Sequence, residues 1–191
     1  MKRRRRSSLE ELEARVSQHV RAGKGISNRV LQRFCSNVCT KKFAGVYSAD
    51  RLPGELTARG SFIAVVNLGK RRGVGGRPDP GHFVTIVGER GRLWYLDPYG
   101  LPVFQPHVLQ FLDLRRRRWT VIENTKQIQD ADSYYCGLYA ILFSMYYDLP
   151  RRQRGKVVRF EWHKRRKDLK KNDALCVKYI RELLRRRHVY S

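Results

Sequence analysis

The sequence lacks any long apolar run. No stretch of its 191 residues approaches the roughly 18–20 apolar residues that a membrane-spanning helix needs. The basic residues at positions 2–6 are not followed by an apolar segment, so the sequence predicts no secretory signal. We therefore expect a protein that is neither secreted nor embedded in a membrane.

Paired cysteines are also lacking. The four cysteines form no C-x-x-C pair, and no two histidines stand at zinc-ligand spacing, so we expect no metal site. Dispersed cysteines without a secretory signal are expected to be reduced thiols. One of them is a candidate nucleophile; the four are Cys35, Cys39, Cys136 and Cys176.

Acidic residues are scarce. The chain has 17 aspartates and glutamates against 41 lysines and arginines, which gives a formal net charge of +24 and a pI near 10.6. A charge this large favours a polyanionic partner, most often nucleic acid, and carries no information about the fold. The hydrophobic fraction of 41% supplies enough apolar material for one folded domain, so wholesale disorder is excluded.

The basic charge is concentrated at the two ends of the chain. Residues 1–6 hold five basic residues, and residues 151–191 hold sixteen basic against four acidic residues. Residues 79–114, in contrast, carry a net charge of −2. We therefore predict a basic N-terminal tail at 1–6 and a single domain at 7–191, whose segment from about residue 151 is basic and helical.

Hydrophobic periodicity predicts an α+β domain. A helix beginning at Cys136 is apolar nearly all round, so we expect it to be central, buried and packed on a mixed or antiparallel sheet. A turn at 88–91 between two β-rich runs predicts an antiparallel hairpin, and residues 70–80 are expected to form a loop. The expected helices are 7–22, 136–147 and 174–187, and the expected strands are 62–68, 82–87, 93–96 and 119–122.

Cys136 is the cysteine best placed for chemistry, because it opens the predicted buried helix after a polar loop. Free backbone N–H groups and the positive end of the helix dipole favour the thiolate at such a position and can stabilise an oxyanion. The alternative is an ordinary buried cysteine that acts as a small hydrophobic residue.

Three polar residues are candidates to act with this thiol. His82 begins one strand of the predicted hairpin and Asp97 ends the other, so the two side chains can meet at one edge, where a carboxylate orients an imidazole. Gln129, seven positions before Cys136, carries an amide that can donate to an oxyanion. Taken singly, each has an ordinary alternative role: a surface histidine, a turn aspartate and a loop glutamine.

The order of these four residues along the chain and the short sequences around them resemble the adenovirus maturation protease (adenain) family. A more distant resemblance is to the proteases of SUMO and other ubiquitin-like proteins. The matching strings are GHF at 81–83, WYLDPYG at 94–100 and QDADSYYCGLY at 129–139. The segment KKFAGV at 41–46 also looks like the adenoviral layout, and the likeness covers about residues 8–147.

This resemblance implies a papain-like-clan cysteine protease with a central nucleophile helix. Cys136 is then the nucleophile and His82 the base that forms an ion pair with it. Asp97 orients His82, at a position where the adenoviral enzymes usually have glutamate. Gln129 and the backbone N–H of Cys136 form the oxyanion hole.

The resemblance also implies the substrate. Family substrates have glycine near the scissile bond, which requires a narrow groove lined by aromatic side chains. Trp94, Tyr134 and Tyr135 are candidates for its walls, with core packing as the alternative.

The function implied is that of a viral or virus-like endopeptidase that processes structural precursor polypeptides in the host nucleus and the virion. The adenoviral enzymes bind DNA without sequence preference and are stimulated by it, which agrees with the charge of this chain. The expected contacts are Arg115–Arg118 and the basic side of 151–187, and Lys2–Arg6 resembles a nuclear-localisation run. We expect a monomer without a metal or organic cofactor.

The chain departs from the adenoviral pattern in its cysteines. Adenoviral enzymes are activated by a short peptide joined by a disulfide upstream of the oxyanion glutamine, but residues 40–135 contain no cysteine. A covalent activator at that place is excluded. A peptide activator, if used, binds non-covalently or through Cys35 or Cys39.

Two other functions stay open at this point. One is a deconjugating protease that cleaves after the Gly-Gly of a ubiquitin-like protein. The other is a basic nucleic-acid-packaging protein in which the triad-like residues are inert.

Overall fold

The computed structural model describes residues 14, 18, 25–40, 42–69 and 81–190. The predicted N-terminal tail and the predicted loop at 70–80 lie outside these residues. Of the predicted helix at 7–22, only Ala14 and Gln18 are described, and both are helical. Among the described residues, no helix has the length and apolarity needed to cross a bilayer.

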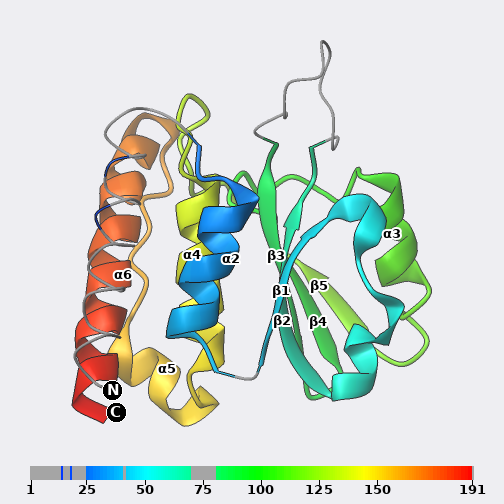
Figure 1. Cartoon of the computed structure of the whole chain (residues 1–191). Helices are drawn as coiled ribbons and strands as arrows, with labels where there is room; N and C mark the ends of the chain where they lie inside the picture. The colour runs from blue at the N-terminus through cyan, green and yellow to red at the C-terminus, as the bar shows by residue number, and fades with distance from the viewer. Residues whose placement is uncertain (1–13, 15–17, 19–24, 41, 70–80, 191) are drawn as a thin grey trace.

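A five-stranded sheet forms the centre of the fold (Figure 1), with the strands arranged in sequence order. The three middle strands are antiparallel, whereas each edge strand pairs parallel to its neighbour, so the sheet is mixed. The predicted α+β class and the predicted hairpin are confirmed. The strands are β1 (Phe43–Ser48), β2 (Ser61–Asn67), β3 (Phe83–Glu89), β4 (Arg92–Leu96) and β5 (Thr120–Glu123).

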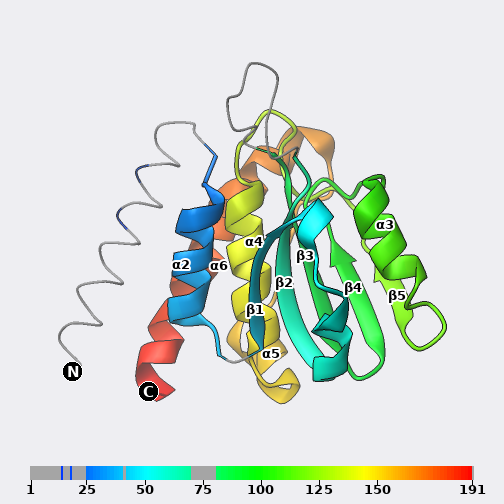
Figure 2. The same cartoon turned by 45° about the vertical axis from the view of Figure 1, so that its right-hand side comes forward.

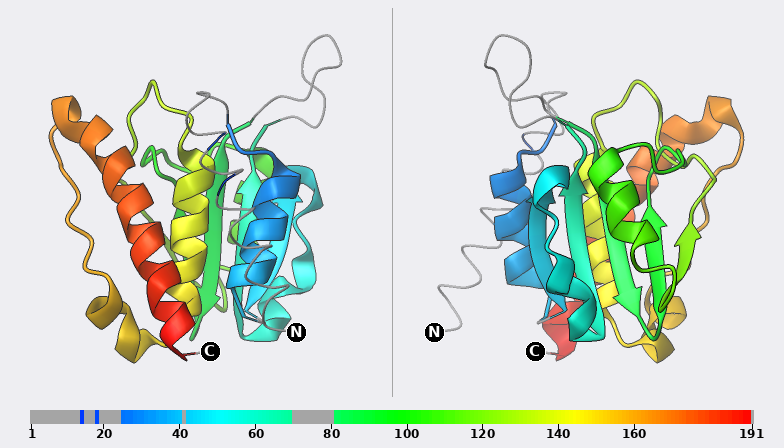
Figure 3. Two further views of the ribbon diagram at one scale, coloured as in Figure 1. Left: turned by 60° about the vertical axis from the view of Figure 1, so that its left-hand side comes forward. Right: turned by 90° about the vertical axis from the view of Figure 1, so that its right-hand side faces the viewer.

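Helices cover both faces of the sheet (Figures 1 and 2). Three longer helices pack on one face, and a single short helix with two 3-10 turns packs on the other. Figure 3 shows the two layers in turn: α2, α4 and α6 lie in front of the sheet in the left view, and α3 lies in front of it in the right view. The helices are α2 (Asn28–Val38), α3 (Pro106–Asp113), α4 (Cys136–Asp148), α5 (Arg151–Val157) and α6 (Leu169–Tyr190).

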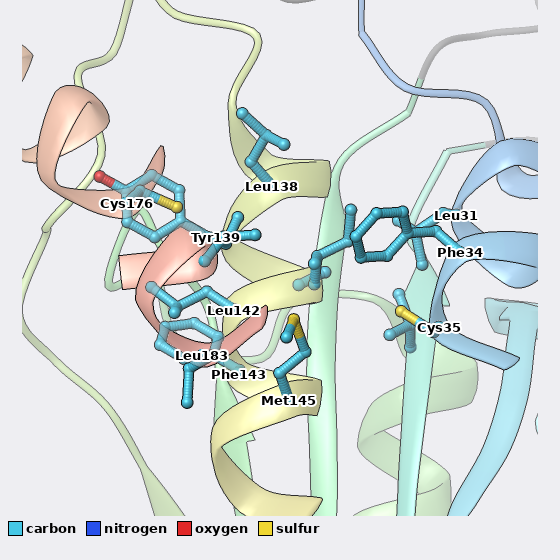
Figure 4. Close-up of a cluster of buried hydrophobic side chains, with 14 of the residues drawn as sticks. Leu31, Phe34, Cys35, Leu138, Tyr139, Leu142, Phe143, Met145, Cys176 and Leu183 are labelled. Carbon is cyan, nitrogen blue, oxygen red and sulfur yellow. The ribbon is translucent and has the colours of Figure 1, made fainter. Parts of the chain in front are cut away.

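Helix α4 is the most buried of the described helices, as its all-round apolar sequence predicts. It lies between the sheet, α2 and α6, and Figure 4 shows side chains from all three helices meeting around it. Phe34 of α2 and Leu183 of α6 are each about 1% exposed, and Leu142 of α4 is fully buried. This packing on three sides fixes the position of the residue at which α4 begins.

Helix α6 begins five residues earlier than predicted, at Leu169 rather than at residue 174. A 3-10 turn at Arg166–Asp168 leads into it, and Asp168 forms an ion pair with Lys171 one turn later. The periodicity of apolar residues does not reveal this first turn, because its buried side chains include the polar Asn172 and Asp173.

A buried ion pair joins α5 to the sheet. The guanidinium of Arg154, which is 7% exposed, donates to both carboxylate oxygens of Glu89 at 2.9 Å and to the carbonyl oxygens of Tyr147 and Leu149. Within the basic C-terminal segment, this arginine is therefore a structural residue rather than part of a charged surface.

Replacing Arg154 with alanine is expected to lower the free energy of unfolding by about 2–3 kcal/mol, because the largely buried carboxylate of Glu89 would keep only the more distant Lys42 at 3.8 Å as a partner. The matched control is Arg116→Ala, which breaks more exposed pairs with Asp113 and Glu123 and should cost less than about 1 kcal/mol. Urea denaturation of both variants measures the difference, and equal losses would show that burial of the Arg154 pair is unimportant.

Candidate active site

Three of the predicted site residues meet at one end of the sheet. His82 directly precedes β3, Asp97 directly follows β4, and Cys136 is the first residue of α4. In Figure 1, the start of β3, the end of β4 and the start of α4 lie together at the upper end of the sheet. Antiparallel pairing of β3 with β4 brings the first two side chains to the same end of the sheet. The observed register, with Thr85 opposite Leu96, is centred one residue later than the predicted turn, so His82 and Asp97 meet diagonally rather than directly opposite each other.

The imidazole of His82 and the carboxylate of Asp97 form a close pair. Nε2 of His82 lies 2.8 Å from Oδ1 of Asp97, and the two side chains are 17% and 0% exposed. A hydrogen bond of this length with an ionised partner fixes the orientation of the ring. His82 and Asp97 are therefore in contact, as the predicted hairpin indicates.

The backbone of Asp97 is held by a residue from a distant part of the chain. Oδ1 of Asn124 accepts a hydrogen bond from the Asp97 N–H at 2.6 Å, and Nδ2 of Asn124 donates to the Asp97 carbonyl oxygen at 2.6 Å. Asn124 therefore brackets Asp97 from both sides. No sequence pattern predicts this contact, because Asn124 follows β5 and reads as an ordinary loop residue.

Tyr99 is a second residue at the site that the sequence does not single out for this role. Its ring stacks on the ring of His82 with centroids 4.7 Å apart, and its N–H donates to Oδ1 of Asp97 at 2.7 Å. The hydroxyl donates to the Ser133 carbonyl oxygen at 3.2 Å. Tyr99 therefore touches the imidazole, the carboxylate and the loop that leads to Cys136.

Cys136 occupies the N-terminus of α4 with an exposed fraction of 8%. The first N–H groups of a helix have no acceptor within the helix, so the N–H groups of Cys136 and Gly137 are available to an anion beside the thiol. A side chain at Gly137 would approach Ile26 to 3.1 Å, which explains why glycine follows the cysteine.

The imidazole of His82 is predisposed to carry a proton. Burial lowers the pKa of His82. Its hydrogen bonds to Asp97 and Cys136 and the negative charges of these groups outweigh this effect and raise the pKa of His82 to about 9. Asp97 occupies Nε2 of His82. The other ring nitrogen, the buried Nδ1, has no well-aligned hydrogen bond within the described residues, so it is left for the thiol of Cys136. The arrangement favours an imidazolium at neutral pH.

Gln129 is fully buried, and the nitrogen of its amide is bonded within its own loop and to Tyr99, whereas the buried Oε1 has no hydrogen-bond partner among the described residues. Nε2 donates to the Ser133 carbonyl oxygen at 2.8 Å and lies 3.2 Å from Ser133 Oγ and 3.1 Å from the Tyr99 hydroxyl. Because an amide nitrogen has two hydrogens, these three acceptors use its donor capacity. The role of Gln129 as an oxyanion donor stays a prediction, and it requires this amide to leave one of these partners.

The three aromatic candidates for the groove walls lie in different surroundings. Trp94 packs against Tyr147 of α4 at a centroid distance of 5.9 Å, at the opposite end of that helix from Cys136, and so belongs to the core. Tyr134 is 60% exposed, whereas Tyr135 is half-buried at the N-cap of α4. Of the three candidates, only the two tyrosines are next to Cys136 in the chain.

Gly81 controls how the chain enters the site. It has a φ of +62°, and a Cβ at this position would overlap the side-chain amide of Asn67 at the end of β2. The Asn67 amide is itself held, because its Oδ1 accepts from the Gly69 N–H and its Nδ2 donates to Asn28. A side chain therefore cannot be accommodated directly before His82.

Gly81→Ala is expected to lower the free energy of unfolding by about 2–3 kcal/mol, through left-handed strain and overlap with Asn67. Displacement of the following peptide should also slow alkylation of Cys136, because His82 moves. The control is Gly91→Ala, at a φ of +73° with open space around it, which should show the strain alone. Thermal unfolding and alkylation rates test this, and identical behaviour of the two variants would contradict it.

No group of three or more metal-binding side chains comes together among the described residues. No protein-family model and no curated protein matches the chain. The functional interpretation therefore depends on the geometry of the site and on the local strings around it.

Proposed function

We propose that this chain is a cysteine endopeptidase of the papain-like clan, similar to the adenovirus maturation proteases. One observation carries the proposal: His82 is hydrogen-bonded to the buried carboxylate of Asp97 and lies beside the thiol of Cys136 at the start of a buried helix. Base, orienting carboxylate and nucleophile are the three parts that thiol-dependent acyl transfer needs.

The proposed reaction begins with the Cys136 thiolate and the protonated imidazole of His82. Sulfur attacks the peptide carbonyl carbon, and the π electrons of the carbonyl move to its oxygen, next to the N–H groups at the start of α4. Collapse of this intermediate breaks the C–N bond, and the leaving amine takes the proton from His82. Water, deprotonated by His82, then attacks the thioester and releases the acid and the thiol.

The proposed substrates are precursor polypeptides with glycine near the scissile bond, as in the adenoviral enzymes that the chain resembles. Glycine suits this site because Cys136 is only 8% exposed. The substrate backbone must come close to the start of α4, and a glycine leaves room for that approach. Tyr134 and Tyr135, which directly precede Cys136 in the chain, are the proposed aromatic contacts for the substrate.

Nucleic acid is the proposed second partner. Exposed basic side chains run along α6 and the segment before it, and Arg117 and Arg118 are exposed at the start of β5. Arg115 is excluded from this surface, because its guanidinium donates to the carbonyl oxygens of Phe111 and Gly54. Phosphate contacts by such residues give an affinity that reads no sequence and falls steeply with salt.

The test uses the full chain and a Cys136→Ala control. We expect cleavage of glycine-containing precursor peptides, stimulation by DNA at low salt, and labelling of Cys136 by a thiol-directed vinyl sulfone. Preferential cleavage of ubiquitin-like fusions would favour a deconjugating protease instead. Absence of both cleavage and selective labelling would leave a basic nucleic-acid-packaging protein.

A further inference from the structure

Two polar side chains at the start of α6 are buried against the loop that leads to Cys136. Asn172 is fully buried and Asp173 is 5% exposed, although both belong to the strongly basic C-terminal segment. In Figure 1 the first turns of α6 lie at the same end of the molecule as the loop between β5 and α4. Burial of polar side chains at this place requires specific partners.

Asn172 finds its partners in two separate segments. Nδ2 donates to the carbonyl oxygen of Ile128 at 2.9 Å and to that of His163 at 3.0 Å, and Oδ1 accepts from the His163 N–H at 2.8 Å. The amide group thereby uses both of its hydrogens. Since Ile128 directly precedes Gln129, Asn172 ties the loop to α6 at the position next to the predicted oxyanion donor.

Asp173 holds the other end of the same loop. Its Oδ1 lies 3.0 Å from the hydroxyl of Tyr139, which also lies 3.1 Å from the Ile128 carbonyl oxygen. The hydroxyl of Ser133, which lies 3.1 Å from the Asp130 carbonyl oxygen, and the backbone N–H of Asp130 also act on this carboxylate as hydrogen-bond donors. Among the described residues no lysine or arginine forms an ion pair with Asp173, so donors from the loop and from α4 hold it instead.

We propose that Asn172 and Asp173 are positioning residues that fix the loop carrying Gln129, so that α6 determines part of the geometry of the candidate active site. This inference rests on the proposed function for its catalytic meaning and extends it to a helix that the resemblance does not cover. The ionised carboxylate of Asp173 is the form that accepts hydrogen bonds from Tyr139, Ser133 and Asp130.

Protonation of Asp173 should loosen the loop. Burial raises the pKa of Asp173 to about 6, against the hydrogen bonds from Ser133, Tyr139 and the Asp130 backbone. The ionisable groups that act on it come from the loop, from α4 and its N-cap, from the segment after β4 and from α6: they are Asp130, Tyr139, Tyr135, Tyr99 and Cys176. As the pH falls through about 6, the carboxyl gains a proton and can no longer accept all of these bonds.

The experiment compares the full-length chain with Asp173→Asn. We expect faster hydrogen exchange at the amides of residues 128–133 and a fall in kcat for a glycine-containing peptide of about 10–100-fold. Alkylation of Cys136 by iodoacetamide should stay within about twofold, because the thiol and His82 are not touched. The acidic limb of peptide turnover near pH 6 in the unmodified chain should be absent from the variant.

A second variant and a control make the result decisive. Tyr139→Phe removes only the bridging hydroxyl and should reproduce the faster exchange and the lower kcat if Asp173→Asn fails to fold. Asp168→Asn removes a partly exposed carboxylate five residues earlier, paired with Lys171, and should change neither. Unchanged exchange at 128–133 in the foldable variants overturns the proposal. Faster exchange in a chain that hydrolyses no peptide supports the positioning and rejects the proposed function.

Discussion

Replacing His82 with alanine is expected to lower kcat/KM for peptide hydrolysis by at least about a thousandfold. The imidazole has two roles in the proposed reaction: it stabilises the Cys136 thiolate as an ion pair and it gives the leaving amine its proton. Alanine at position 82 removes both. Without the imidazolium, alkylation of Cys136 should follow the pH dependence of an ordinary thiol, so its rate near pH 6 should fall by about tenfold or more.

The measurements are steady-state hydrolysis of a peptide substrate and the pH dependence of iodoacetamide alkylation. His107→Ala is the matched control, because His107 is an exposed residue of α3 on the opposite face of the sheet. It should leave both measurements unchanged. If His82→Ala kept the alkylation rate of the unmodified chain at pH 6, the proposed ion pair would not exist.

The sequence predicts the central part of this site because local patterns determine it. A turn at 88–91 flanked by β-rich runs predicts the hairpin and brings His82 and Asp97 to the same end of it, although the observed register is centred one residue later than predicted. The apolar sequence from Cys136 onward has no polar face, so the helix must be buried on several sides. Both predictions require only neighbours in sequence.

Contacts between distant segments are not predictable in this way. Asn124 lies 27 positions from Asp97, and Asn172 lies 44 positions from Ile128. Neither residue stands in a motif, and the contact of each exists only once the two distant segments that it joins have packed together. The C-terminal segment shows the same limit, because its net charge predicts a surface, whereas Arg154 and Asp173 face inward.

Weakly patterned elements are missed for a related reason. Helix α2 buries only one side, β1 is mostly half-buried at the edge of the sheet, and α3 is eight residues long. Short or edge elements carry few apolar positions, so the period of their pattern is poorly defined. Trp94 illustrates the opposite error: an aromatic residue near a motif suggested a groove wall, but its strand position directs it into the core.

Removal of the Asp97 side chain should have the second largest effect on the reaction. Asp97→Ala leaves Nε2 of His82 and the N–H of Tyr99 without their shared acceptor, in a position that is fully buried. We expect kcat/KM to fall by about 10²–10⁴-fold, because the imidazole loses both its orientation and its stabilising charge. Asp97→Asn keeps an oxygen acceptor for both groups and removes only the negative charge. Its loss of activity should therefore be smaller than that of Asp97→Ala.

The pH dependence of stability separates the charge effect from the loss of orientation. The pKa of His82 is about 9 in the folded chain against 6.5 as its ordinary value, so protonated His82 stabilises the fold fully below about pH 6.5. This contribution, on the order of 2–3 kcal/mol, is lost as the pH rises through about 9. Asp97→Asn lowers the folded pKa, so the variant should lose less stability than the unmodified chain between about pH 6 and pH 10. Urea denaturation across this range measures the difference, and parallel stability curves would show that the charge of Asp97 does not act on His82.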